Sequence, residues 1–208
     1  MLHSFESRRA GDALIALMRD PDVSIREAAA RSLGTMGSPW TVEGLSRSLY
    51  DSEMSVRMLA AASLGRIGGT AAFAALRRGL RGPDGRANPS AAGALAKRGD
   101  PEGLPALLDA LKDEDGGARL QASFALVELK DPRAVQPLIR LLGNEDPTLS
   151  DVAARTLSKM GGKEAVEALI RSLKDSRARV RRAAALTLGN IRDPSAVDAL
   201  LRLLGDGD

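Results

Sequence analysis

The chain has 208 residues, with 30 Lys or Arg against 27 Asp or Glu and no Cys, so its formal net charge is only +3 and no disulfide can form. No apolar run approaches the roughly 20 residues that a membrane-spanning helix needs, and the N-terminal segment lacks the apolar core of a secretory signal. These features predict a protein without a membrane segment, and the cytoplasm is the expected compartment.

A unit of 31 residues recurs along the chain, beginning at residues 7, 38, 69, 100, 131 and 162, with a half unit at 193–208. In the copy at 162–192, apolar residues three and four apart form one stripe, Asp175 and Ser176 interrupt it, and a second stripe follows. Each stripe covers about three helical turns, which would be marginal alone in water. The unit therefore predicts two antiparallel helices that bury facing stripes.

The repeat period decides the expected fold class. Position 23 of the unit is Ala and position 27 is Leu in all six full copies. A fixed period of this length is typical of a solenoid in which each helix pair packs only on its neighbours. We predict an all-α solenoid, or superhelix, of six antiparallel helix pairs and a terminal half repeat, forming a single array over residues 1–208.

Capping residues mark the unit boundaries in chain order. Asp followed by Pro at 100–101, 131–132 and 193–194 indicates a helix start, and a Gly before the next unit indicates the end of a second helix. Pro105 and Pro137 lie further inside, so a short separate turn is expected before those first helices. The Gly positions are Gly37, Gly68, Gly99 and Gly161.

The third unit departs from the pattern between Gly82 and Asn88, residues 82–88, where Gly and Pro replace the usual turn. Asn88 and Pro89 then read as a new N-cap and first helical position, so this second helix is expected to begin late and be short. The segment is either a tolerated irregularity or a mobile loop that bends the array or contacts a partner.

Positions 14 and 20 of the unit vary together: four copies have Asp and Arg, and two copies have neither. This covariation suggests that the two side chains interact, either as a lock across the turn or as a ladder between repeats, and it favours a structural role over a catalytic one. The pairs are Asp20 and Arg26, Asp51 and Arg57, Asp113 and Arg119, and Asp175 and Arg181.

The patterns at 131–142 and 175–191 resemble HEAT repeats, and more narrowly the short HEAT-like repeats of phycobilisome lyases. The resemblance covers nearly the whole chain. It implies an Asp–Arg ladder and a concave face lined by the second helices. Some HEAT-like proteins are hydroxylases that hold iron with repeated His–Glu pairs, and this chain lacks such pairs. Others are DNA repair glycosylases with basic concave faces.

No arrangement of residues indicates catalysis. His3 is the one histidine, so a two-His metal site and a Ser–His–Asp triad cannot be built. The Gly pairs at 68–69 and 161–162 read as helix ends and not as phosphate loops. The expectation is a protein that is not an enzyme and has no metal or other cofactor.

Charge is banded along the chain. The copies at 69–99 and 162–192 each carry a net charge of +5 (six basic and one acidic residue, and eight basic and three acidic), whereas 100–130 carries −4 (three basic and seven acidic). A continuous basic stripe, typical of nucleic-acid binding, is therefore not expected. The cluster of Arg177, Arg179, Arg181 and Arg182 is either a phosphate contact or a solvated face in which Arg181 belongs to its turn pair.

The expected partner surface lies on second-helix positions that the core does not use. Met58 and Phe124 would form the walls of a shallow groove over the third unit, with basic residues at its rim, unless these side chains pack between repeats. The predicted partner-binding residues are Met54, Met58, Ala62, Arg66, Lys97, Leu120, Phe124, Glu128, Arg155, Lys159, Arg182 and Leu186.

These observations predict a non-catalytic scaffold that binds an unidentified protein on its concave face. Two alternatives remain: a subunit of a phycobilin lyase or isomerase, implied by the resemblance, and nucleic-acid binding through the arginines. In the last half unit, Ala199 and Leu203 lie on the side away from the preceding pair, so self-association there is a further possibility.

Overall fold

The computed structural model describes residues 2–203, and it describes side chains from residue 8 to residue 201. Within that range every regular element is a helix, apart from one isolated β-bridge between Arg81 and Ala87. None of the described helices is long and apolar enough to span a lipid bilayer. The predicted all-α class is confirmed.

The contacts divide the chain into two compact units, Met1–Ala106 and Leu107–Asp208, and the division falls within α7 (Gly103–Ala110). The first unit contains α1 (Leu2–Leu17), α2 (Val23–Met36), η1 (Pro39–Thr41), α3 (Val42–Arg47), η2 (Ser48–Tyr50), α4 (Met54–Ile67), α5 (Gly69–Arg78) and α6 (Pro89–Lys97). The second contains α8 (Gly116–Leu129), η3 (Pro132–Ala134), α9 (Val135–Leu142), α10 (Pro147–Met160), α11 (Gly162–Ser172), α12 (Ala178–Ile191), η4 (Pro194–Ala196) and α13 (Val197–Leu203).

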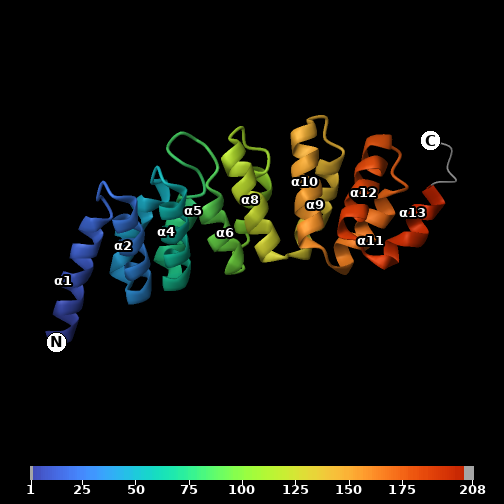
Figure 1. Cartoon of the computed structure of the whole chain (residues 1–208). Helices are drawn as coiled ribbons and strands as arrows, with labels where there is room; N and C mark the ends of the chain where they lie inside the picture. Colours follow the sequence, from blue (N-terminus) through green and yellow to red (C-terminus); the bar gives the residue numbers. More distant parts are fainter. Residues whose placement is uncertain (1, 204–208) are drawn as a thin grey trace. The chain divides into compact units, whose positions relative to one another are not determined.

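Helix pairs stack in two layers within each unit (Figure 1). In the first unit, α2 packs on α4 and α4 on α6, while α3 packs on α5. In the second unit, α8, α10 and α12 pack consecutively, and α9 packs on α11. The second helices of the repeats therefore form one layer and the first helices the other, as the solenoid prediction requires.

The core of each unit lies between the two layers and is built from Leu, Ala, Val and Ile. The recurrent Ala and Leu of the second helices are almost completely buried, for example Ala60 and Leu64 in α4 and Ala153 and Leu157 in α10. A small residue at position 23 lets neighbouring helices approach closely while the larger Leu one turn later fills the space between them.

Helix ends follow the predicted capping pattern. The carboxylates of Asp131 and Asp193 accept hydrogen bonds from main-chain N–H groups two residues on, and each begins a short 3-10 turn before the α-helix. Gly37 ends α2 with a φ of 64°, in the left-handed region. Where the equivalent residue is not Gly, Lys130 and Arg192 adopt φ values of 49° and 58°, which the sequence did not indicate.

In the third 31-residue repeat, residues 69–99, the second helix begins late, as predicted. Asn88 is the N-cap of α6, accepting a hydrogen bond from the Ala91 N–H, and Pro89 is the first helical residue of a nine-residue helix. The preceding segment is a hairpin-like turn closed by main-chain hydrogen bonds from Gly82 N to Arg86 O (2.8 Å) and from Gly85 N to Gly82 O (2.9 Å).

Candidate functional site

All twelve residues predicted to contact a partner are exposed. In the first unit they include Met54, Met58, Ala62 and Arg66, which are four residues apart and so form one stripe along α4. Met54 is 49% exposed and Met58 is 48% exposed, whereas Val56 on the same helix is fully buried. The alternative expectation, that the methionines pack between repeats, does not fit these exposures.

On the second helices of the second unit, the exposed large apolar side chains are Leu120 and Phe124 on α8 and Leu186 on α12. Half or more of the surface of each is accessible: 56%, 50% and 62%. On α8, Ala122 and Leu126 are fully buried, so the helix has separate core and outer faces. Polar residues are the usual occupants of such outer positions, and a row of large apolar ones is typical of a binding surface.

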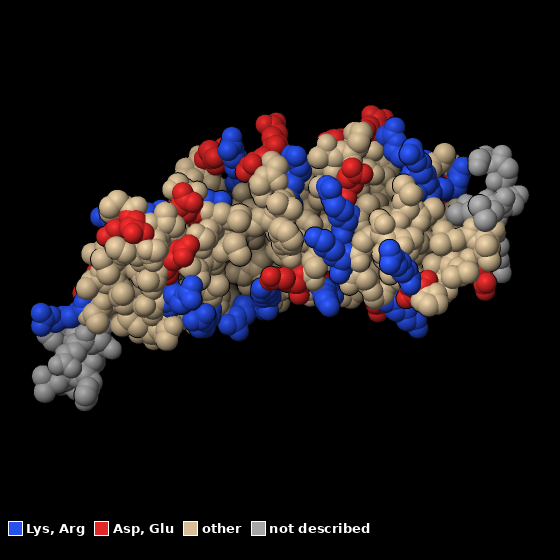
Figure 2. Space-filling model, in the orientation of Figure 1, with Lys and Arg blue, Asp and Glu red and all other residues tan. Residues whose placement is uncertain are grey.

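Cationic side chains lie between these apolar residues. Because α10 packs on both α8 and α12, its exposed Arg155 and Lys159 lie between the outer stripes of those two helices. The Lys159 ammonium is 5.1 Å from the centre of the Phe124 ring, a cation–π contact that joins α8 to α10. Figure 2 shows Lys and Arg side chains in a row over the region of α10, with uncharged surface on the side of α8 and further Lys or Arg side chains on the side of α12.

The predicted groove between Met58 and Phe124 stays a prediction. The two residues belong to different units, Met58 to the first and Phe124 to the second. The predicted rim residue Lys97 is the last residue of α6 and is exposed, and Glu128 is exposed near the end of α8. Within the second unit, the apolar and basic residues adjoin where Lys159 contacts the ring of Phe124.

Each arginine of the four Asp–Arg pairs closes the turn of its own repeat. Its guanidinium donates to two successive main-chain carbonyls, those of the paired Asp and of the next residue, at 2.8–3.2 Å. These carbonyl groups lie in the turn between the two helices of the repeat, outside both helices, so the bonds satisfy acceptors that no helical N–H pairs with. The arginines concerned are Arg26, Arg57, Arg119 and Arg181.

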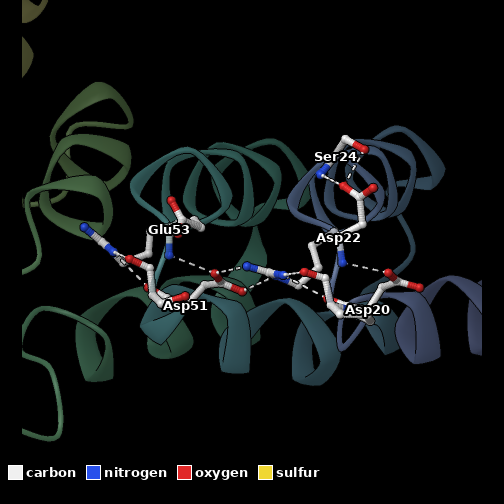
Figure 3. Close-up of polar contacts among 9 residues, drawn as sticks. Asp20, Asp22, Ser24, Asp51 and Glu53 are labelled. Atoms are coloured by element: carbon white, nitrogen blue, oxygen red, sulfur yellow. Dashed lines mark hydrogen bonds and ion pairs between the residues drawn. The ribbon is translucent and has the colours of Figure 1, made fainter.

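Arg26 also joins one repeat to the next, because it pairs with Asp51, which Figure 3 labels. It donates from Nε and Nη2 to the two carboxylate oxygens of Asp51 at 2.9 and 3.0 Å, and both side chains are about nine-tenths buried. Burial alone would raise the pKa of Asp51, but the hydrogen bonds from Arg26 and from the Glu53 N–H outweigh it and lower that pKa. The pair therefore combines the turn lock and the inter-repeat contact in one side chain.

In the two copies that lack the Asp–Arg pair, shorter side chains make related contacts. Asn88 takes the place of the arginine, is buried, and donates from Nδ2 to the carbonyl of Leu49 in the preceding repeat at 2.8 Å. Ser150 donates from Oγ to the carbonyl of Leu142, also at 2.8 Å. Sequence reasoning missed both contacts, although an Asn or Ser at position 20 was the available signal.

Three of the four arginines in the 177–182 cluster are held by contacts within the second unit. Arg177 pairs with Asp175 at 3.0 Å, Arg179 donates to the carbonyl of Asn144, and Arg181 holds its own turn. The remaining member, Arg182, is exposed on α12. This arrangement opposes the hypothesis that the cluster as a whole contacts phosphate.

The Asp175–Arg177 pair gives a specific expectation for pH. The hydrogen bonds from the Arg177 side chain and main-chain N–H lower the pKa of Asp175 from its ordinary 3.8 to about 2. Because the folded-state pKa is depressed, the stabilisation is complete above the ordinary value and is lost as pH falls through about 2. A carbon-detected NMR titration of the carboxyl group should give a midpoint near 2. In Arg177→Gln the midpoint should move up towards 3.8, and an unmoved midpoint would show that Arg177 is not the cause.

The last helix differs from its expected exposure. Ala199 is half-buried, and the side chain of Leu203 lies outside the described residues. The exposed apolar residues of α13 are instead Val197 and Leu201, at 51% and 60%. In the preceding copy the residue equivalent to Val197 is Val166, which is only 2% exposed, because position 5 of a repeat faces the next repeat. Self-association through this end stays a prediction.

A family model for HEAT repeats matches residues 11–88, 80–158, 105–179 and 140–208. The chain belongs to the HEAT-repeat family. A comparison with curated proteins gave no significant match. The predicted resemblance is thus confirmed at the level of the family, and with it the helical repeat scaffold.

The fold of this chain is also seen in a solved structure, and other solved structures are similar to the chain. The E. coli protein YibA is 18% identical, with 99% of this chain and 91% of YibA covered and a TM-score of 0.51. The complex of CpcE and CpcF, a phycocyanin lyase of Nostoc, is 25% identical with a TM-score of 0.42, covering 95% of this chain and 81% of that one. An engineered protein is 23% identical with a TM-score of 0.42; the match covers 94% of this chain but only 61% of the engineered one.

Proposed function

We propose that this HEAT-repeat chain is a non-catalytic scaffold that binds another protein on the outer face of its second helices. The observation that carries the proposal is the exposure of Leu120 and Phe124 on α8, half or more of each side chain, beside the fully buried Ala122 and Leu126. Large apolar groups left in water cost free energy, which a partner that covers them recovers.

The exposed methionines of α4 support the same function in the first unit. Methionine is flexible and polarisable, so Met54 and Met58 can adapt to the shape of a bound surface. Their stripe ends in Arg66, which is exposed and can steer an acidic partner. Apolar contact residues beside charged ones are the usual composition of a protein interface.

Capture from a native lysate of the source cells tests this proposal. Leu120→Asp/Phe124→Asp should lose a protein that the wild type retains, because two carboxylates would have to be buried against the partner's apolar side chains. The matched control is Gln136→Asp/Lys163→Gln, which makes the same change in net charge on exposed residues of α9 and α11. Circular dichroism should show both variants folded. Equal capture by all three chains would refute the proposal.

The two alternative functions remain open to simple tests. A bound linear tetrapyrrole would be visible as absorbance of the co-purified chain, and it would support the phycobilin lyase subunit. Binding of nucleic acid with a steep dependence on salt would support recognition of phosphates by the arginines.

A further inference from the structure

Six exposed side chains on three adjacent second helices form what is here named the basic–apolar patch. Its members are Leu120 and Phe124 on α8, Arg155 and Lys159 on α10, and Arg182 and Leu186 on α12. All lie in the second unit, and α10 packs on both of its neighbours. The patch therefore has an apolar edge on α8, a cationic centre on α10 and a mixed edge on α12.

The cations of the patch are available to a partner. Among the described residues, no ion pair or hydrogen bond engages the side chain of Arg155 or Arg182, and Lys159 contacts only the face of the Phe124 ring. Other arginines of this unit are engaged, such as Arg177 with Asp175. Two carboxylates lie on the same helices as the patch. Glu128 on α8 already interacts with another residue, and Asp151 on α10 is exposed one turn before Arg155.

The spacing of the helices sets the size of a matching ligand. Neighbouring packed helices lie about 8–10 Å apart, so the patch spans roughly 16–20 Å from α8 to α12. A helix laid across it needs about 11–13 residues at 1.5 Å per residue, or three to four turns. One apolar side of such a helix would cover Phe124 and Leu186, and acidic residues on its flanks would reach the cations of α10 and α12.

We propose that the basic–apolar patch binds an acidic amphipathic helix of another protein. This inference rests on the proposed scaffold function and adds the chemistry of the partner. The exposed apolar groups Leu120, Phe124 and Leu186 require apolar side chains opposite them, which a phosphate backbone does not offer. The uncommitted Arg155 and Arg182 require carboxylates, since burying them unpaired would oppose binding.

Selection from a phage-displayed library of random peptides of about 16 residues on the full chain tests the proposal. The selected peptides should combine Asp or Glu with large apolar residues at helical spacing. A synthetic peptide from this set should bind Arg155→Glu/Lys159→Glu at least tenfold more weakly than wild type. It should bind Arg140→Glu/Arg171→Glu, a matched pair of exposed arginines on the first helices α9 and α11, with unchanged affinity.

Three results would overturn the proposal: selected peptides that are neutral or basic, peptides that bind Arg155→Glu/Lys159→Glu as tightly as wild type, or no binding peptides at all. Displacement of the peptide by a single-stranded RNA would assign the patch to nucleic acid instead. Thermal unfolding of each variant shows that it is folded. If lysate capture depends on Leu120 and Phe124 but the peptides are not acidic, the scaffold function stands and this inference fails.

Discussion

Replacing Gly103 by alanine is expected to destabilise the first unit by about 1–3 kcal/mol, the usual range for overpacking a well-packed site. A Cβ atom at Gly103, the first residue of α7, would lie 2.2 Å from the main-chain N of Ala96 and 2.6 Å from its Cα. These atoms belong to the last turn of α6 and cannot rotate away as a side chain would. The backbones of the two helices would have to separate.

The direction of the stability change in Gly103→Ala distinguishes overpacking from the effect of helix propensity. Alanine in place of glycine inside a helix ordinarily stabilises by up to about 1 kcal/mol. Gly65 in α4 is the matched control, because a Cβ there would meet only Ala94, at ordinary distances of 3.6 Å from its Cβ and 3.8 Å from its carbonyl oxygen. Gly65→Ala should therefore leave stability unchanged or raise it. Similar unfolding midpoints for the two variants would show that α6 and α7 do not approach this closely.

Trp40 provides the measurement for the first unit. It is the single tryptophan of the chain, and it lies in the first unit with its ring against Gly11 and near the guanidinium of Arg8. Its fluorescence in a urea titration reports the unfolding of this unit, whereas circular dichroism reports both units. Because repeat arrays can unfold in parts, the two signals should be recorded together. Gly103→Ala is expected to move the fluorescence midpoint to lower urea.

Asp51→Asn is expected to destabilise the first unit by about 1–3 kcal/mol as well. The asparagine can still accept the hydrogen bond from the Glu53 N–H, so the turn keeps its cap. The change removes the charge that balances Arg26, whose side chain is only 11% exposed, and a poorly paired buried charge is costly. The effect should vanish at low pH, since protonation of Asp51 in the wild type removes the same charge.

Asp22→Asn is the control for this variant. Asp22 also accepts a hydrogen bond from a main-chain N–H two residues on, that of Ser24, but it is exposed and caps α2 (Figure 3). Asparagine is an equally good N-cap, so the free energy of unfolding should stay within about 0.5 kcal/mol of the wild-type value. An equal loss in both variants would mean that the cost comes from capping and not from the pair between repeats.

The repeat pattern was sufficient to predict the fold and the outer residues of the second helices. Period and hydrophobic spacing determine which side of each helix faces the core, so Met58, Leu120 and Phe124 were correctly expected on the outside. The late start of α6 followed from Asn88 and Pro89, because an N-cap followed by proline is a local signal.

Features that depend on the distance between repeats were not predictable in this way. Covariation of Asp and Arg indicated an interaction but left open whether Arg26 binds its own turn or the carboxylate of the next repeat, and it does both. The close approach at Gly103 depends on how α6 and α7 cross. Lys130 and Arg192 adopt the left-handed conformation at the position that holds Gly in the other four full copies, although Lys and Arg do not by themselves indicate it.

Site-specific photo-crosslinking tests most directly whether the second-helix face is the binding surface. Benzoylphenylalanine would replace Phe124 on the exposed side of α8 or, as the control, the exposed Gln136 on α9. If partners bind on the second helices, illumination in native lysate should give a discrete adduct from position 124 and none of that mass from position 136. The same adduct from both positions, or one only from 136, would contradict binding on this face.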